Sequence, residues 1–160
     1  MSFYPEIGAL VISQTAEYAL RAVAALAGQP DQPMVTSRLA ELTRVPAGYL
    51  AKVMQSLGRA GLVNSARGVG GGFTLARPAT EISIYDIVQA VDPLQRIRTC
   101  PLGLSAHGVR LCPLHRRLDD AMKQVEDAFR ASNLAEILAE PTGSKPLCNF
   151  PLEKLASKKA

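Results

Sequence analysis

The chain has 160 residues, a net charge of +4 and a hydrophobic fraction of 48%, which fits one globular domain with an appendage. It has no run of roughly 18 apolar residues, so we expect no membrane-spanning segment. It also lacks the basic leader of a secretory signal, so we expect a soluble cytoplasmic protein. The chain has three cysteines, a small and odd number that argues against a disulfide framework.

The first part of the chain is predicted to be helical. Residues 1–12 show no clear periodicity and contain Pro5, so we expect an N-terminal extension there. Apolar periodicity then predicts three helices, over residues 13–27, 36–43 and 47–60. Ser13 and Thr36 are the expected N-caps of the first two helices. In the third helix the apolar residues have the i, i+3, i+4, i+7 spacing of a buried face: Leu50, Val53, Met54 and Leu57.

The periodicity changes after Gly61. Two short strands are predicted at 62–66 and 73–75, joined by the glycine-rich turn 67–72. This turn does not match a dinucleotide-binding fingerprint, because Phe73 stands where a glycine is needed and a strand follows instead of a helix. A helix pair followed by a hairpin is typical of a winged helix. With a further helix near 83–91, residues 13–91 are therefore predicted to form a winged helix-turn-helix domain.

The C-terminal half predicts a loop and a long helix. Residues 92–112 contain several prolines and glycines and lack periodicity. A long amphipathic helix should follow, and with a short helix capped by Ser132 or Asn133 it would occupy residues 113–140. We expect a flexible tail over 141–160. The long helix carries an apolar stripe at Leu114, Leu118, Met122, Val125 and Phe129. The stripe either packs on the chain's own core or forms the seam of a dimer.

The predicted fold is thus mainly α with a small β-hairpin wing, and its basic charge indicates DNA binding. Six basic residues and one acid lie between Arg38 and Arg77, a net charge of +5. Such an excess marks a nucleic-acid surface or a solvated basic face. The polar side of the third helix and the wing could reach phosphates and base edges. The candidate DNA-binding residues are Ser13, Arg38, Tyr49, Lys52, Gln55, Ser56, Arg59, Arg67 and Gly68.

A second constellation gathers cysteine and histidine. Cys100, His107, Cys112 and His115 lie within sixteen residues, and they include both histidines of the chain. Thiolate and imidazole are ligands for zinc and for iron–sulfur clusters. The wide spacing of the two cysteines is not that of a tight knuckle, so Cys112 could instead be a core residue and His115 a solvated one. Cys148 is expected to be a bystander.

Several motifs resemble the IscR/NsrR-type (Rrf) winged-helix regulators. They are Gln14–Ala22, Tyr49-Leu50, Gly61-Leu62-Val63 leading into Arg67–Phe73, Ile87–Val91, and the segments beginning at Cys100 and Cys112. The resemblance is collinear over about residues 10–140. It implies a homodimeric bacterial regulator that binds palindromic operator DNA and holds a cluster in the loop before the long helix. The family's initiator methionine falls at Leu10, so translation is expected to be able to start there.

The resemblance also implies a ligand set. Cys100 and Cys112 match two of the family's three cysteines, His107 stands near the missing one, and His115 matches a histidine ligand of one relative. Glu17 matches an acidic position that supplies a carboxylate from the other subunit in some relatives. Two thiolates with harder ligands favour [2Fe–2S] over [4Fe–4S]. We therefore expect a non-enzymatic transcription regulator, most often a repressor, that senses redox state, iron or nitric oxide. The alternative is a cluster-free regulator, or a thiol or metal protein using Cys100 and Cys112 as a redox pair.

Overall fold

The computed structural model describes residues 11–107 and 110–141. The expected start at Leu10, most of the predicted extension and tail, and Cys148 lie outside the described residues, as does the side chain of His107. In the described ranges, no helix is long and apolar enough to cross a membrane. The expected cytoplasmic location and the predicted domain borders remain predictions.

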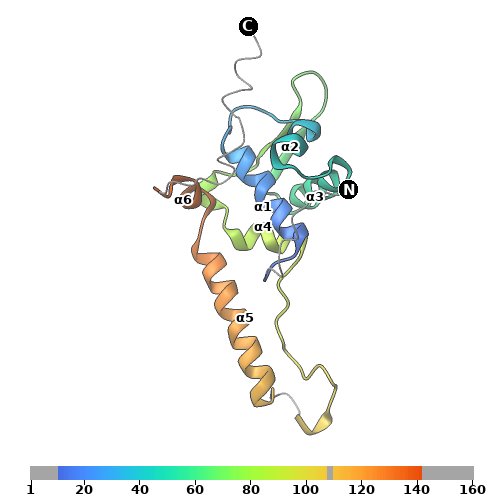
Figure 1. The fold of residues 1–160 in the computed structure, drawn as a ribbon, viewed down its shortest axis with the longest axis vertical. Helices are drawn as coiled ribbons and strands as arrows, with labels where there is room; N and C mark the ends of the chain where they lie inside the picture. Colours follow the sequence, from blue (N-terminus) through green and yellow to red (C-terminus); the bar gives the residue numbers. More distant parts are fainter. Residues whose placement is uncertain (1–10, 108–109, 142–160) are drawn as a thin grey trace.

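The N-terminal part of the structure, here called the head, contains four helices and a hairpin (Figure 1). Its elements are α1 (Gln14–Ala27), α2 (Thr36–Thr43), α3 (Ala47–Arg59), β1 (Val63–Ala66), β2 (Gly72–Leu75) and α4 (Ile84–Val91). A short 3₁₀ turn, η1 (Ala79–Glu81), precedes α4. The predicted fold class, mainly helical with one hairpin wing, is confirmed.

Helix α1 lies at the centre of the head and packs against α2, α3 and α4. Its alanines Ala16, Ala19 and Ala22 are completely buried, which lets neighbouring helices approach closely. The larger buried side chains come from every surrounding element: Leu39, Leu50, Met54, Leu57, Leu62, Ile82 and Ile87. This shared apolar core holds the head together, since burying each such side chain is worth about 1.5–3 kcal/mol.

The wing is hydrogen-bonded to the α1–α2 connection. Strands β1 and β2 pair antiparallel, with Val63 opposite Leu75 and Ala66 opposite Gly72. Met34 adds a further bridge: its backbone N–H donates to Phe73 O at 3.0 Å, and Phe73 N–H donates back to Met34 O at 2.8 Å. The free edge of β2 is therefore fixed to the α1–α2 connection near the turn of the hairpin.

Residues 92–131, here called the arm, leave the head and return to it (Figure 1). The chain runs outward through residues 92–112, which include the short turn η2 (Ser105–His107), and comes back as α5 (Pro113–Ala131). Helix α6 (Leu134–Ala139) then packs on the head through buried Leu134, whose N–H donates to Ile82 O at 2.8 Å. No residue of α5, all of which the structure describes, is buried.

The structure tests the predicted N-caps of three helices. Thr36 is not an N-cap: Val35 occupies that position, because its carbonyl already accepts the Leu39 N–H of the first helical turn. Between the two candidate caps of α6, Asn133 is the one that caps, since its side chain accepts from Glu136 N. Ser13 caps α1 as predicted.

Candidate functional site

The outer face of α3 is polar, as predicted. Its apolar residues Leu50, Val53, Met54 and Leu57 are buried in the core. On the opposite side Lys52, Gln55 and Arg59 are exposed, and Ser56 is half-buried. Together they place N–H and O–H donors on one helix surface, which is what reading phosphates and base edges in a major groove requires.

Tyr49, a predicted DNA contact, also binds α1. Its hydroxyl shares a hydrogen bond with the Thr15 hydroxyl, and its ring meets that of Tyr18 edge-on, with centroids 5.5 Å apart. Tyr49 still keeps 41% of its surface exposed. It therefore holds the first turn of α3 against α1 while part of the ring remains available to a ligand. The sequence did not reveal this contact, because its partners are 34 residues apart.

Arg21 supports the turn between α2 and α3. Its Nη1 donates to the Thr43 carbonyl at 3.2 Å, and its Nε donates to Glu17 Oε1 at 2.8 Å. Thr43 ends α2, where carbonyls without helical partners attract a cation. Arg44 follows with φ of 54°, an uncommon conformation for a residue with a side chain. The sequence alone does not reveal this role, although the i, i+4 spacing of Glu17 and Arg21 indicates that these two residues form an ion pair.

Two other candidate DNA contacts have defined places in the fold. The Ser13 hydroxyl accepts the Ala16 N–H at 3.2 Å and so caps α1. Arg38 is half-buried on α2, the helix that precedes α3. The DNA contacts assigned to both residues remain predictions.

The wing tip is small and open. Arg67 and Gly68 are exposed, and Val69 between two glycines is fully exposed. Gly68 and Gly70 have φ of 90° and 76°, and nothing lies within 4 Å of a Cβ placed on either. At Gly72, the first residue of β2, there is no such space: a Cβ there would lie 2.6 Å from the backbone carbonyl carbon of Met34. The open tip can thus approach a nucleic-acid backbone, while the start of β2 is packed closely against Met34.

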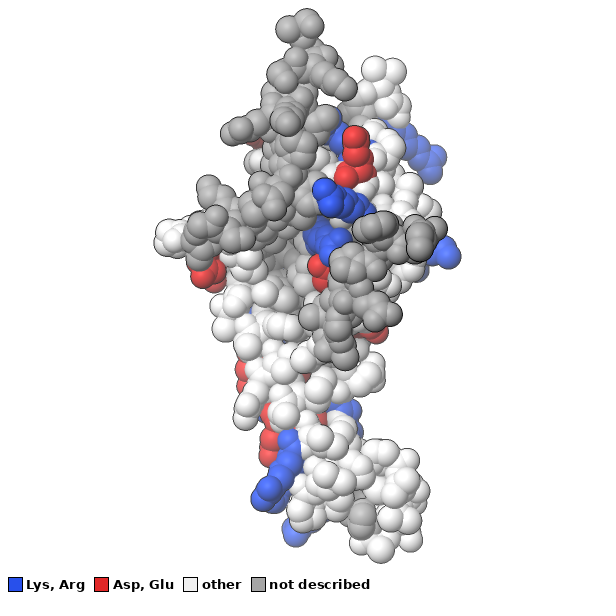
Figure 2. Space-filling model, viewed as in Figure 1, with Lys and Arg blue, Asp and Glu red and all other residues white. Residues whose placement is uncertain are grey.

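Basic side chains are not confined to the head. On the face drawn in Figure 2, lysine and arginine side chains lie both on the upper body and near the lower end of the arm. Arg110, Arg116 and Arg117 at that end are exposed. The net charge of the winged-helix segment therefore does not by itself locate a DNA surface, and the exposed donors of α3 carry that assignment.

The structure brings together part of the cysteine–histidine constellation. Cys112 occupies the N-cap position of α5, and its Sγ lies 3.4 Å from His115 Nδ1. Both residues are half-buried, whereas Cys100 in the loop is only 9% exposed. Cys112 is not among the buried residues of the apolar core, and whether it or His115 binds a metal remains a prediction. Cys100 and Cys112 are both free thiols.

Glu17 lies on α1 in the head, while the two cysteines belong to the arm (Figure 1). One of its carboxylate oxygens binds Arg21, and the other, Oε2, is buried without a hydrogen-bond partner among the described residues. A buried carboxylate oxygen without a partner is energetically costly. Oε2 therefore retains the capacity to accept a hydrogen bond or to bind a cation.

These donors fit an iron–sulfur cluster as part of a ligand set. A thiol and an imidazole 3.4 Å apart can bind one metal centre in common, and Glu17 Oε2 lacks a partner. Within the described residues, no three Cys, His, Asp or Glu side chains come together.

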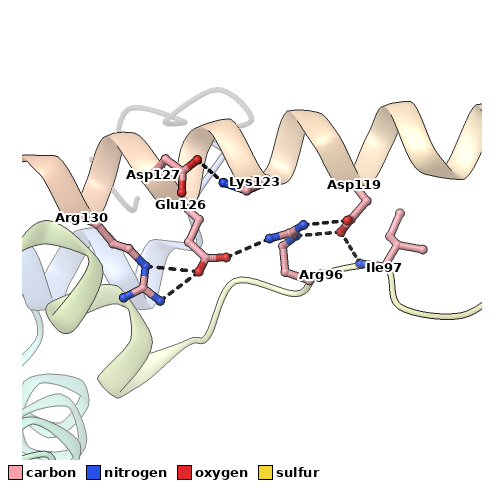
Figure 3. A network of polar contacts seen from close by, with 7 residues as sticks. All are labelled: Arg96, Ile97, Asp119, Lys123, Glu126, Asp127 and Arg130. Carbon is pink, nitrogen blue, oxygen red and sulfur yellow. Dashed lines mark hydrogen bonds and ion pairs between the residues drawn. The ribbon is translucent and has the colours of Figure 1, made fainter.

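Figure 3 shows a polar network between the loop and α5 that the sequence analysis did not find. Arg96 binds Asp119 through two hydrogen bonds, Nε to Oδ1 and Nη2 to Oδ2, each 2.7 Å long. The Ile97 N–H also donates to Asp119 Oδ1, at 2.8 Å. Arg96 Nη1 further reaches Glu126 Oε2 at 3.5 Å. The loop is therefore held to α5 by charged groups.

The same contacts shift the pKa values of the network. The hydrogen bond from Arg96 lowers the pKa of Asp119 to about 2, assisted by the Ile97 N–H and the positive charge of Arg98 and opposed by burial. The hydrogen bond from Arg130 lowers the pKa of Glu126, and the one from Arg96 adds to it. The pKa of Arg96 is raised, mainly by its hydrogen bond with Asp119. All of these groups are charged at neutral pH.

The helical core, the polar α3 and the glycine-tipped wing define a winged-helix, DNA-binding transcription regulator. Comparison with known proteins agrees. A protein of Aquifex aeolicus described as an HTH-type transcriptional regulator is 30% identical over 132 residues, which cover 81% of this chain and 92% of that protein. A Mycobacterium tuberculosis protein with the same description is 36% identical over 129 residues, covering 78% and 80%.

Solved structures are similar over most of the chain. T. potens IscR has a TM-score of 0.67 and 25% identity, covering 81% of this chain and 86% of that one. Staphylococcus aureus CymR has a TM-score of 0.64 and 27% identity, covering 82% and 100%. The family model for Rrf2, described as an iron-dependent transcriptional regulator, matches residues 12–140. The chain belongs to the Rrf2 family, which confirms the resemblance found in the sequence. Its relatives are transcriptional regulators and not enzymes.

Proposed function

We propose that this regulator acts as a homodimeric repressor of a palindromic operator, with α3 in the major groove and the wing beside it. The exposed donors Lys52, Gln55 and Arg59 support the placement of α3. Arg67 at the base of an open glycine tip suits the narrow minor groove. A two-fold dimer would place two copies of α3 about 34–36 Å apart, one turn of DNA, on matching half-sites.

The uncovered face of α5 supports the dimer. Leu114 and Leu118, at its outer end, are 64% and 48% exposed. They continue a stripe whose inner members are only half-buried: Met122, Val125 and Phe129. An amphipathic helix that buries none of its apolar residues needs another surface to cover them. A second copy of the same helix is self-complementary, as a two-fold interface requires.

The dimer is tested with Leu118→Asp, which places a charge on the stripe. We expect a monomer in sedimentation velocity and loss of operator binding, with the helical circular dichroism of the head retained. Gln124→Asp adds the same charge to an exposed position of α5 away from the stripe, so it should remain dimeric. A dimeric Leu118→Asp protein would contradict the assignment of α5 as the interface.

We further propose that an iron–sulfur cluster controls operator binding. The observation that carries this proposal is the Cys112–His115 contact at the start of α5. Cys100 and Cys112 would supply the thiolates, His115 or His107 an imidazole, and the second subunit the Glu17 carboxylate. We favour [2Fe–2S] over [4Fe–4S], since fewer thiolates and harder ligands suit a two-iron centre. When bound, such a group supplies a redox- and iron-dependent constraint.

The chain's own residues would convert that constraint into DNA affinity. Cys112 and His115 lie in the first turn of α5, and Cys100 lies in the loop that leads to it. Fixing or releasing these side chains shifts the outer end of α5 and with it the dimer seam. The spacing of the two α3 helices then changes. A typical allosteric coupling of about 1–3 kcal/mol would give roughly 5- to 150-fold regulation.

The decisive experiment is a visible absorption spectrum of protein purified without oxygen, with iron and sulfide assays, before and after dithionite. We expect charge-transfer bands that bleach on reduction. Cys100→Ala and Cys112→Ala should abolish them, and Cys148→Ala, a predicted bystander, should retain them. Operator binding is then measured with loaded and apo-protein. A colourless protein without iron after anaerobic reconstitution would contradict the cluster and leave DNA binding intact.

A second candidate is a cluster-free thiol regulator. Cys100 and Cys112 are both free thiols, and Staphylococcus aureus CymR has been solved in an oxidized form. Here the thiols of Cys100 and Cys112 would lose two protons and two electrons to hydrogen peroxide, giving one disulfide and two water molecules. A peroxide-dependent change in operator affinity that Cys100→Ala abolishes, in iron-free protein, would favour this candidate over the cluster.

A further inference from the structure

We propose that Arg96 is the positioning residue of the cysteine-bearing loop: it fixes the segment leading to Cys100 onto α5 and connects that segment to α4. The inference rests on the proposed sensing function of the loop. It assigns a role to a charged cluster that DNA binding and cluster ligation leave unused.

The contact between Arg96 and Asp119 has the geometry of an anchor. Two parallel N–H···O bonds of 2.7 Å join the guanidinium to the carboxylate, the most specific form of an ion pair between these groups. The Arg96 and Asp119 side chains are only 16% and 15% exposed. Asp119 Oδ1 also accepts the Ile97 N–H. One carboxylate thus fixes both a side chain and the backbone of the loop.

This anchor lies where the loop lacks any other regular support. Residues between α4 and η2 belong to no helix or strand, so side-chain contacts determine their position. Cys100 comes four residues after Arg96 and is buried, although it is not part of the head's apolar core. Because Cys100 lies in this irregular segment, its position follows from the contacts that fix the segment, and Arg96 supplies two hydrogen bonds from the segment to α5.

From Arg96 the network continues to the DNA-binding part. Glu126 receives Arg96 Nη1 and also binds Arg130, at 2.9 Å from Nη2. The Arg130 guanidinium stacks over the ring of Tyr85, 3.4 Å from its centroid. Tyr85 lies on α4, and α4 packs directly against α3. These contacts form a continuous series from the loop to α4, which packs against α3. A displacement of the loop can therefore reach α4 through them.

The same helix provides a matched control. Lys123 and Asp127 also form an ion pair on α5, but their side chains are 55% and 56% exposed. Both residues belong to α5, so this pair joins no other element. Removing it changes the charge of the arm as Arg96→Gln does and leaves the loop contact intact.

The first measurement is amide hydrogen exchange of metal-free protein. In Arg96→Gln and Asp119→Ala we expect the Ile97 amide to exchange on the order of tenfold faster. Amides of α1 and α3 serve as internal controls and should keep their parental rates, since α5 contributes no buried residue to the core. Lys123→Gln should match the parent throughout. Parental exchange at Ile97 in both loop variants would overturn the proposal.

The second measurement is alkylation of Cys100 in protein that also carries Cys112→Ser and Cys148→Ser. Iodoacetamide should react slowly with the parent thiol and on the order of tenfold faster after Arg96→Gln. Arg96→Lys keeps the charge but cannot form the two-pronged contact, so it should give an intermediate rate. A rate unchanged by Arg96→Gln would also overturn the positioning role.

The connection to α4 is tested by a double-mutant cycle on operator affinity, using Arg96→Gln and Tyr85→Leu in metal-free protein. Coupled residues give non-additive changes, whereas independent ones add. Additivity would overturn the route to α4. Because these measurements need no cluster, they stand apart from the spectrum and iron assays on which the proposed sensing function depends.

Discussion

The head and the arm are held together by different forces. The head buries side chains from four helices in one apolar core, and its polar contacts lie at helix ends and turns. The arm buries no residue of α5 and is held to its loop by Arg96, Asp119 and Glu126. The difference indicates that the head's sequence completes its own packing. The arm depends on charge within the chain, and it leaves Leu114 and Leu118 of its apolar stripe exposed.

The largest effect is expected from truncating the head's core. Leu50 on α3 is completely buried, and Leu50→Ala should cost about 2–5 kcal/mol of unfolding free energy through lost burial and a cavity. Leu104→Ala, at a side chain 48% exposed in the arm loop, should change stability little. Urea denaturation followed by circular dichroism measures both. Equal losses would mean that the arm belongs to the same cooperative core.

A smaller loss should follow the removal of Arg21. Arg21→Ala breaks the bond to the Thr43 carbonyl and leaves the half-buried Glu17 carboxylate without its partner. We expect about 1–2 kcal/mol of lost stability and weaker operator binding, because the turn before α3 loses its support. Glu17→Gln, which keeps Arg21 and an acceptor oxygen, should retain more affinity. If both variants bind the operator as the parent does, Arg21 does not position α3.

For the capping box at the start of α4 we expect an effect near 1 kcal/mol. The Ser83 hydroxyl accepts the Asp86 N–H at 3.0 Å and Asp86 reciprocates, so Ser83→Ala should cost about 1 kcal/mol. Ser83→Thr retains a capping hydroxyl and should be close to the parent. Thermal unfolding distinguishes the two, and identical melting temperatures for Ser83→Ala and the parent would show that the cap contributes nothing.

The DNA surface should be separable from stability altogether. Lys52 and Arg59 are exposed on α3, so Lys52→Ala and Arg59→Ala should unfold like the parent. Each should lower the slope of log affinity against log salt by about 1 if it contacts a phosphate. Lys123→Ala on the arm is the control and should leave the slope unchanged. Parental slopes for both α3 variants would mean that the wrong face is assigned.

Acid should loosen the arm before the head. The folded pKa of Asp119 is lowered from 3.8 to about 2, mainly by Arg96, so its contribution is present above pH 4 and is lost as pH falls from about 4 towards 2. Burial alone acts in the opposite direction. Protection of the Ile97 amide from hydrogen exchange, relative to an unstructured amide at the same pH, should therefore fall in this window. An Asp119→Ala protein should lack that fall in protection, and its persistence there would assign it to another group.

Much of the head was readable from the sequence. The buried face of α3 follows from four apolar residues at helical spacing, and the hairpin follows from a glycine-rich turn between two short runs. The fine contacts were not readable: Tyr49 with Thr15, Arg21 with Thr43, and Arg96 with Asp119 join residues 34, 22 and 23 positions apart. Such pairs have no periodic signature, so the fold has to bring them together first.

The candidate metal site shows the same limit. The cysteines and histidines were visible as a cluster in sequence, and the structure joins Cys112 to His115. It places Glu17 on the head instead, bound to Arg21. Sequence spacing can report residues that share a loop. It carries no information on which of these donors the fold brings together.

The bridge between Met34 and Phe73 has a consequence for how operator preference can diverge. It joins β2 to the α1–α2 connection, and a Cβ on Gly72 would meet the Met34 backbone. Substitution of Gly72 therefore disturbs the core, whereas Gly68 and Gly70 have open space around them and are restricted by their positive φ alone. Descendants of this chain can change the fully exposed Val69 between them without disturbing the core, and new binding preferences should arise there first.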